Sequence, residues 1–393
     1  MRIAYITSRF PFPTEKGDKL RAFQHIRYLS RAHEVHCFAI THDPVTAPAV
    51  KVLEAHCASV RIYRISRWKL ILNIARSVFN GLPVQVGYFL DPAAKRLLQT
   101  DLIRTAPDHI VTQLIRTTEY VRSVPHRKTL DYMDTFSYGA SQRASSDRWW
   151  KRAFYLFEAH RLRKYERQIY QDFDHHLIIS HQDRARLPLP YQRSVHVLPN
   201  GVDLDHYQPQ DTASASEVVF VGNMGYMPNI EAAEFLVQRV MPEVWQTVPE
   251  ATVCIAGARP HRRVRRLQSP KVRVTGWVED VRPLYASGRV FVAPMFSGMG
   301  QQNKILEAMA MGRPCITTSI VNNAIGATPN VHLLLAENSR QFADQIVHVI
   351  TDPALAGALA GAARQFVEDE FDWESQNKKL DRILYKQEIA EHA

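Results

Sequence analysis

Short apolar runs alternate with longer amphipathic stretches along almost the whole chain. Such runs, rich in Val, Ile and Phe, are typical of strands buried on both faces, and the stretches between them have the periodicity of helices. This alternation predicts parallel sheets. The runs lie at about 3–6, 34–41, 59–65, 108–112, 128–134, 177–180, 195–198, 218–221, 252–256, 272–275, 289–293 and 315–318. The expected helices lie at about 18–31, 47–57, 148–172, 228–248, 303–311, 341–350 and 354–369.

A chain of 393 residues is too long for one ordinary hydrophobic core, so we expect two domains. The turn Asn200-Gly201 lies halfway along the chain, and residues 208–216 are polar, as in a linker. We predict a first domain over 1–207, a second over 208–370, and a closing helical segment over 371–393.

Lysine and arginine total 49 and acidic residues 39, so the net charge is 49 − 39 = +10. This charge suits an anionic substrate or an anionic surface. The basic run 259–266 is expected to be a solvated helix, so we expect no nucleic-acid partner. Cys37, Cys254 and Cys315 lie in apolar runs and are expected to be buried thiols of a cytoplasmic protein. The histidines show no metal-ligand spacing, and the N-terminus has a strand pattern rather than that of a signal peptide.

The most informative stretch is Pro294–Pro314, which lies between two apolar runs. It contains Gly298 and Gly300, and a helix is expected to begin near Asn303. A glycine-containing loop that leads into a helix N-terminus presents backbone N–H groups and the positive end of the helix dipole to an anion. Lys304 places a cation in the first turn, where the dipole disfavours it, so a bound anion would compensate. The stretch therefore predicts a phosphate site.

Other strand ends carry candidate site residues. Gly17 follows the first strand, and Gly222 and Asn223 follow the strand at 218–221. Such loops line the ligand crevice of parallel sheets, but no Gly-x-Gly-x-x-Gly is present, which argues against a nicotinamide or flavin site. Asp131 and Asp134 follow another apolar run. Their carboxylates could bind hydroxyl groups or accept a proton, and the alternative is that they cap the following loop.

Two motifs carry a resemblance to a family. Glu307-Ala-Met-Ala-Met-Gly-Arg-Pro314 and Leu198-Pro-Asn-Gly-Val-Asp203 resemble signatures of GT-B glycosyltransferases of family 4. The loop Gly300-Gln-Gln-Asn-Lys-Ile-Leu-Glu-Ala-Met-Ala310 is closest to the sugar transferases of bacterial exopolysaccharide loci. The chain departs from the usual family pattern at Met299, Asn223 and Asn229, where the family has charged residues, and this puts the usual phosphate clamp in doubt.

The resemblance implies an α/β GT-B fold, in which two doubly wound Rossmann-like domains face a cleft. The first would be the acceptor-side domain and the second the nucleotide-sugar-binding domain, and the helix over 371–393 would cross back to the first. It also implies a retaining, metal-independent glycosyltransferase with no cofactor, which moves a hexose-type sugar from a nucleotide-diphospho sugar to a glycan or lipid-linked glycan. The catalytic candidates are Asp131, Asp134 and Lys304. Glu307 would bind the ribose and residues 276–278 the base. The donor-binding candidates are Gly17, Gly222, Asn223, Gly276, Trp277, Val278, Gly300, Gln301, Gln302, Asn303, Lys304 and Glu307.

Two amphipathic stretches of the first half place aromatic residues among basic ones. Trp68 and Phe79 lie in one stretch, and Trp150, Phe154 and Phe157 lie in the other. Such a helix can lie on an anionic membrane, and the alternative is that each apolar stripe packs on the sheet. We therefore consider a cytoplasmic protein, with an anionic membrane surface at the inner face of the plasma membrane as a further hypothesis.

Two other functions stay open at this stage. Because Met299, Asn223 and Asn229 replace charged residues, the chain could be a binding subunit without catalytic activity. It could also be a sugar-nucleotide epimerase with the GT-B fold. The sequence does not specify the base, the sugar or the acceptor.

Overall fold

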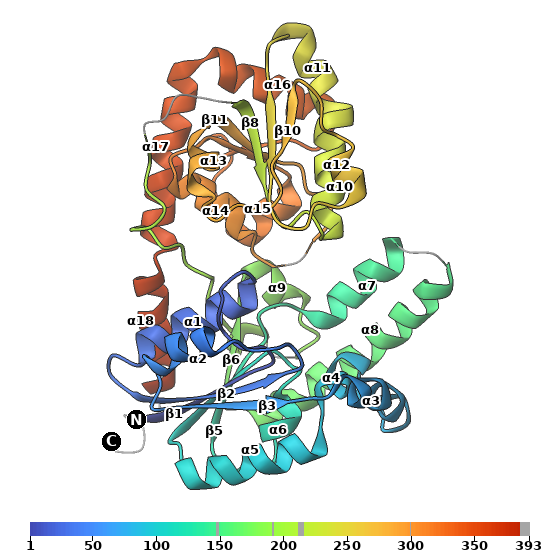
Figure 1. Cartoon of the computed structure of the whole chain (residues 1–393), viewed down its shortest axis with the longest axis vertical. Coiled ribbons are helices and arrows are strands. Elements are labelled where there is room, and N and C mark those ends of the chain that lie inside the picture. Colours follow the sequence, from blue (N-terminus) through green and yellow to red (C-terminus); the bar gives the residue numbers. More distant parts are fainter. Residues whose placement is uncertain (147–148, 191, 211–215, 299, 386–393) are drawn as a thin grey trace. The chain divides into compact units, whose positions relative to one another are not determined.

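The computed structural model describes residues 1–146, 149–190, 192–210, 216–298 and 300–385. The chain divides into two compact units (Figure 1). Unit 1 comprises residues 1–199 together with the segment from Gln376 onward, and unit 2 comprises residues 200–375. The boundaries expected from the sequence, 207/208 and 370/371, differ from these by eight and five residues.

Unit 1 is built on a seven-stranded sheet in which all paired strands are parallel, in the order β3-β2-β1-β4-β5-β6-β7. Side chains along β1 alternate between two cores. Ala4 and Ile6 contact one cluster, whereas Ile3 and Tyr5 contact the other, which explains why this strand is apolar throughout. The strands are β1 Arg2–Thr7, β2 Glu34–Thr41, β3 Ser59–Arg64, β4 His109–Gln113, β5 Arg127–Asp131, β6 His175–Ile178 and β7 His196–Val197.

Helices cover both faces of this sheet. Apolar residues of α1, α2 and α18 belong to one core, and those of α5 and α8 to the other. Helices α7 and α8 form a hairpin (Figure 1). The helices are α1 Gly17–Leu29, α2 Ala47–Glu54, α3 Arg67–Phe79, α4 Val84–Phe89, α5 Pro92–Thr105, α6 Thr118–Val121, α7 Phe136–Ser146, α8 Trp149–Ile169, α9 His181–Arg186 and α18 Trp373–Tyr385, with short 3₁₀ turns at Tyr170–Asp172 and Gln192–Ser194.

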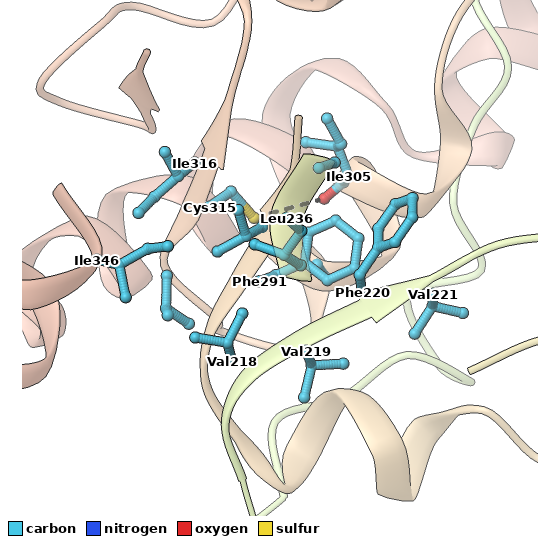
Figure 2. Close-up of a cluster of buried hydrophobic side chains, with 14 of the residues drawn as sticks. Val218, Val219, Phe220, Val221, Leu236, Phe291, Ile305, Cys315, Ile316 and Ile346 are labelled. Carbon is cyan, nitrogen blue, oxygen red and sulfur yellow. Dashed lines mark hydrogen bonds between the residues drawn. The ribbon is translucent and has the colours of Figure 1, made fainter. Parts of the chain in front are cut away.

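Unit 2 has a six-stranded sheet, also with parallel pairs, in the order β10-β9-β8-β11-β12-β13. Figure 2 shows its core, where Phe220 and Phe291 lie beside Ile305 and Cys315. The strands are β8 Ser216–Val221, β9 Val253–Ala256, β10 Val272–Val274, β11 Gly288–Ala293, β12 Cys315–Thr317 and β13 Leu334–Leu335. The helices are α10 Met227–Phe235, the π-helical turn η3 Leu236–Val240, α11 Met241–Thr247, α12 Arg262–Arg265, α13 Arg282–Ala286, α14 Asn303–Ala310, α15 Ser319–Ile325, α16 Ser339–Thr351 and α17 Pro353–Glu370.

The two amphipathic stretches form α3 and α8, but α3 does not pack its apolar stripe on the sheet. Trp68 and Phe79 are exposed, so the packing alternative is wrong for this helix. Phe154 and Phe157 on α8 are about half exposed, and the side chain of Trp150 lies outside the described residues.

Two expectations on composition can be compared with the structure. Cys37, Cys254 and Cys315 are buried free thiols, as predicted, and Cys57 is a partly buried free thiol. Within the described part of the chain, no single helix is long and apolar enough to cross a bilayer. Helices α16 and α17 reach that length and apolarity only as a pair, with a bend of 102° between them.

Candidate functional site

The loop between β11 and α14 has the backbone that its sequence predicted. Gly298 and Gly300 have φ angles of 135° and 68°, values that favour glycine. Helix α14 begins at Asn303, and no side chain caps its N-terminus. The Ile305 N–H donates to the Gln302 carbonyl at 3.0 Å, so the N–H groups of Asn303 and Lys304 are the ones this end presents to an anion. Gly312, with φ of 64°, follows the last turn as a left-handed cap. Met299 lies outside the described residues.

Lys304 is half-buried in this first turn. Its Nζ donates to Asn229 Oδ1 at 2.5 Å, lies 3.3 Å from Met295 Sδ, and stands over the Phe220 ring at 5.5 Å. No carboxylate of the described residues forms an ion pair with it. Burial lowers the pKa of the ammonium to about 7, against the weaker raising effect of Glu307. A phosphate group would supply the negative partner that Lys304 lacks.

Asn223 and Asn229, where the family usually has cations, hold the loop and the lysine. Asn229 is buried in the first turn of α10, and its Nδ2 donates to the Asn223 carbonyl at 2.9 Å. Asn223 Oδ1 accepts from the Gly225 N–H at 3.0 Å. A Cβ at Gly222 would lie 2.9 Å from Asn229 Nδ2, so glycine permits this close approach. Lys304 of α14 thus lies against α10, where the hydrogen bond to Asn229 fixes the position of its ammonium.

Glu307 lies on α14 one helical turn beyond Asn303. The hydroxyl of Tyr285 donates to its Oε2 at 2.8 Å. Burial raises the pKa of the carboxyl, while the Tyr285 hydrogen bond and Lys304 lower it. The carboxylate is therefore oriented by a tyrosine and lies on the same helix as Lys304, as a group that binds ligand hydroxyls would.

Replacing Glu307 with glutamine is expected to weaken donor binding about 10- to 100-fold, because one charge-assisted hydrogen bond is typically worth about 1.5–3 kcal/mol. The measurement is calorimetric titration with a nucleotide sugar, and Glu243→Gln on α11 is the matched control. Equal affinities for the native chain and Glu307→Gln would remove Glu307 from the donor site.

Gln301 is buried, and its side-chain amide is paired with backbone. Its Oε1 accepts from the Asn200 N–H and its Nε2 donates to the Asn200 carbonyl, both at 2.9 Å. Asn303 Oδ1 accepts from Asn200 Nδ2 at 3.4 Å. These contacts join the loop to the Asn200-Gly201 turn. The donor-binding roles predicted for Gln301, Gln302 and Asn303 stay predictions, and for Gln301 the structure gives a bracing role.

The third loop, after β10, meets the loops after β8 and β9. The N–H of Gly257 donates to the Gly276 carbonyl at 3.0 Å. Gly257 has φ of 143°, and a Cβ there would lie 1.7 Å from the Gly222 carbonyl oxygen, so only glycine fits. Trp277 is 71% exposed and Val278 is partly buried. Gly257 was not among the candidates, although a glycine directly after a strand is the signal that selected Gly222.

In unit 1, Asp131 at the end of β5 forms a fully buried ion pair with Arg21 of α1. Its two oxygens lie 2.5 Å from Nε and 3.2 Å from Nη2, and Arg21 Nη1 donates to the Leu198 carbonyl at 2.8 Å. The carboxylate of Asp131 therefore has a structural partner, and its catalytic role stays a prediction. Arg21 was not singled out by the sequence because it lies in an ordinary amphipathic helix.

Asp134 differs from Asp131 although it lies only three residues on. Met133 between them has a positive φ of 57°, and Asp134 is half-buried with no hydrogen bond to its carboxyl from the described residues. Burial and the charges of Asp183, Asp18 and Asp131 raise its pKa to about 7. A carboxyl group with this pKa can exchange a proton near neutral pH.

Gly17 is the first residue of α1, with open space where a Cβ would lie, so a ligand can approach its backbone.

Part of the chain matches a known family, and one relative aligns over nearly its whole length. Residues 215–352 match the family "Glycosyl transferases group 1". Over 98% of the chain and 99% of the relative, the sequence is 22% identical to an uncharacterized 44.6 kDa protein in the cps region of Klebsiella pneumoniae.

Solved structures agree with the fold along almost the whole chain. Sucrose-phosphate synthase from Thermosynechococcus elongatus superimposes with a TM-score of 0.73 and 18% identity, over 99% of this chain and 100% of that one. HepE from Anabaena, in complex with UDP-glucose, superimposes with a TM-score of 0.68 and 15% identity, over 98% of this chain and 100% of that one. Residues 215–352 thus match a glycosyl transferases group 1 domain, and the whole chain has the GT-B fold.

Proposed function

We propose that the protein transfers a hexose-type sugar from a nucleotide-diphospho sugar to a glycan or lipid-linked glycan, with retention of the anomeric configuration and without a metal ion. The observation that carries the proposal is Lys304, a half-buried ammonium without a carboxylate partner among the described residues, in the uncapped first turn of α14. The comparisons support it, since the similar HepE structure contains UDP-glucose and the Klebsiella relative is a cps-region protein.

In the reaction, the bond between the anomeric carbon and the donor phosphate breaks, and a bond from that carbon to an acceptor oxygen forms. The leaving nucleoside diphosphate gains negative charge. Lys304, the α14 N-terminus and the backbone N–H of Asn223 are the groups we assign to that charge, because the N–H groups of Gly222, Met224 and Gly225 already donate within the protein. Glu307 would hold the ribose hydroxyls, and residues 276–278 would cover the base.

The acceptor hydroxyl must lose its proton. We assign this proton to Asp134 rather than Asp131, because Asp131 is engaged by Arg21, whereas Asp134 has a pKa of about 7 and a carboxyl without a hydrogen bond from the described residues. Asp131 is then a positioning residue, which holds Arg21 where its guanidinium binds the Leu198 carbonyl.

The expected location of the protein is the cytoplasm, at the inner face of the plasma membrane.

The test is to incubate the purified chain with UDP-, GDP- and dTDP-sugars and a glycan or lipid-linked acceptor, and to identify products by mass spectrometry and NMR. We expect one donor to be consumed and a glycoside of the donor's anomeric configuration to form. Donor binding without turnover would instead indicate a binding subunit, and isomerised donor in the absence of acceptor would indicate an epimerase.

Metal independence has its own test. The described residues contain no group of three or more His, Cys, Asp or Glu side chains placed to hold a metal ion. We expect the transfer rate to stay unchanged in EDTA, because Lys304 and the helix N-terminus would meet the leaving-group charge. Activity that EDTA abolishes and Mg²⁺ or Mn²⁺ restores would contradict this assignment.

A further inference from the structure

Helix α3 exposes most of its large apolar side chains and buries polar ones. Its described buried side chains are Leu70 and the polar Asn73 and Ser77, whereas its other large apolar side chains face outward. Trp68 is 79% exposed and Phe79 88% exposed. The exposed apolar face of α3 is Trp68, Ile71, Leu72, Ile74, Val78 and Phe79. A soluble helix normally buries such a stripe, so this face is suited to a non-aqueous partner.

Contacts with α4 and α8 fix this orientation (Figure 1). Asn73 Nδ2 donates to the Tyr88 carbonyl at 3.4 Å, and a Cβ at Gly87 would lie 2.2 Å from Ser77 Cβ, so α3 and α4 pack closely along the polar side. Arg161 of α8 donates to the Ser77 carbonyl, and Glu158 of α8 accepts from the first N–H groups of α4 at 2.9 and 3.0 Å. Turning the apolar face inward would break the hydrogen bonds of Asn73 and of the Ser77 carbonyl.

The segment that contains α3 has charges of one sign. Residues 59–90 contain five basic residues and no acidic residue, namely Arg61, Arg64, Arg67, Lys69 and Arg76. Arg61, Arg64 and Arg76 are exposed, and the side chains of Arg67 and Lys69 lie outside the described residues. An exposed apolar helical face in a segment whose only charges are positive matches the headgroup region of an anionic bilayer.

We propose that α3 is an interfacial helix that lies on an anionic lipid surface, with its apolar face inserted among the headgroups. The proposal rests on the proposed function, because a surface-bound transferase would meet a lipid-linked acceptor there. Charge distinguishes this partner from a second copy of the chain. A symmetric dimer brings the same patch of both copies together, and here it would juxtapose two sets of five basic residues.

The experiment is co-sedimentation of the full chain with vesicles of phosphatidylcholine alone, or with about 30% phosphatidylglycerol. We expect binding to the anionic vesicles only, and a fall in binding as NaCl rises from about 0.1 M to about 0.5 M. The variants Trp68→Ser/Phe79→Ser and Arg76→Glu should each lower the partition coefficient about tenfold or more. Their melting temperatures should stay close to that of the native chain, because the replaced side chains are exposed.

Helix α5 of the same unit supplies matched controls, since Leu97 and Ile103 are 61% and 77% exposed and Arg96 is exposed. Leu97→Ser/Ile103→Ser and Arg96→Glu should leave vesicle binding unchanged. Unchanged binding in the α3 variants would overturn the proposal. So would a dimer in light scattering that the α3 variants dissociate, without vesicle binding, which would assign this face to a second copy. Because vesicle binding needs no donor, failure of the transferase proposal would not alter this result.

Discussion

Replacing Asp131 with alanine is expected to lower the free energy of unfolding of unit 1 by about 3–5 kcal/mol, because it removes the carboxylate that neutralises the buried guanidinium of Arg21. Both side chains of the pair have zero exposure, so water cannot replace the lost carboxylate. For a unit of this size the melting temperature should fall by on the order of 10 °C. The measurement is urea and thermal unfolding followed by circular dichroism.

Two further variants separate this ion pair from its surroundings. Arg21→Met/Asp131→Leu removes both charges, and we expect it to be closer to the native chain in stability than Asp131→Ala, since a buried pair can be replaced by apolar groups at small cost. Asp134→Asn lies in the same segment, but its carboxyl is already disfavoured as an anion by burial and by nearby acidic residues. It should therefore melt near the native temperature. Equal losses in Asp131→Ala and Asp134→Asn would refute the structural role of the pair.

The periodicity of the sequence was enough to predict the two parallel sheets, because strands buried on both faces are continuous apolar runs. The expected strand at 34–41 matches β2 in both its ends, and the helix expected near Asn303 begins at that residue. Helices α5 and α7 and the short β13 were not predicted. Residues 136–146 of α7 have no strong apolar stripe, since that helix is partly covered by α8 rather than by the sheet.

The site was predictable where one segment contains all the information, and not where distant segments meet. The loop before α14 and its glycines follow from local spacing. In contrast, Arg21 and Asp131 are 110 residues apart, and the sequence around either residue does not indicate that the two form an ion pair. The same holds for Asn229. Its sequence position indicates only that a cation is missing, whereas in the structure its side chain accepts a hydrogen bond from Lys304. The sequence likewise could not show which face of α3 is covered, because that depends on Gly87 and Arg161 from other helices.

Replacing Lys304 with methionine is expected to lower donor affinity by roughly 10- to 100-fold at pH 7, since a charge-assisted hydrogen bond to phosphate is worth about 1.5–3 kcal/mol. Methionine keeps most of the volume beside Phe220 and Met295, so the fold should be retained. Lys271, the other lysine of unit 2, donates to the Pro249 carbonyl at 2.6 Å, and Lys271→Met is the matched control. Calorimetry with the donor that the sugar panel selects measures both variants.

The pH dependence of donor affinity identifies Lys304 as the phosphate-binding group more specifically than the loss of affinity does. In the free protein the pKa of Lys304 is lowered to about 7, so part of the protein carries a neutral amine at physiological pH. A bound diphosphate favours the ammonium and must raise that pKa. The affinity should therefore be nearly constant below pH 7 and should fall by up to about tenfold per pH unit above it, until the pKa of the complex is reached. Both phosphates of a nucleotide-diphospho sugar are esterified and keep their charge over this range, so they add no slope. Lys304→Met should bind weakly and should lose most of this slope between about pH 6 and about pH 8.5. An undiminished slope in this variant would mean that another group titrates, such as Asp134 with its pKa of about 7, and that Lys304 does not hold the phosphate.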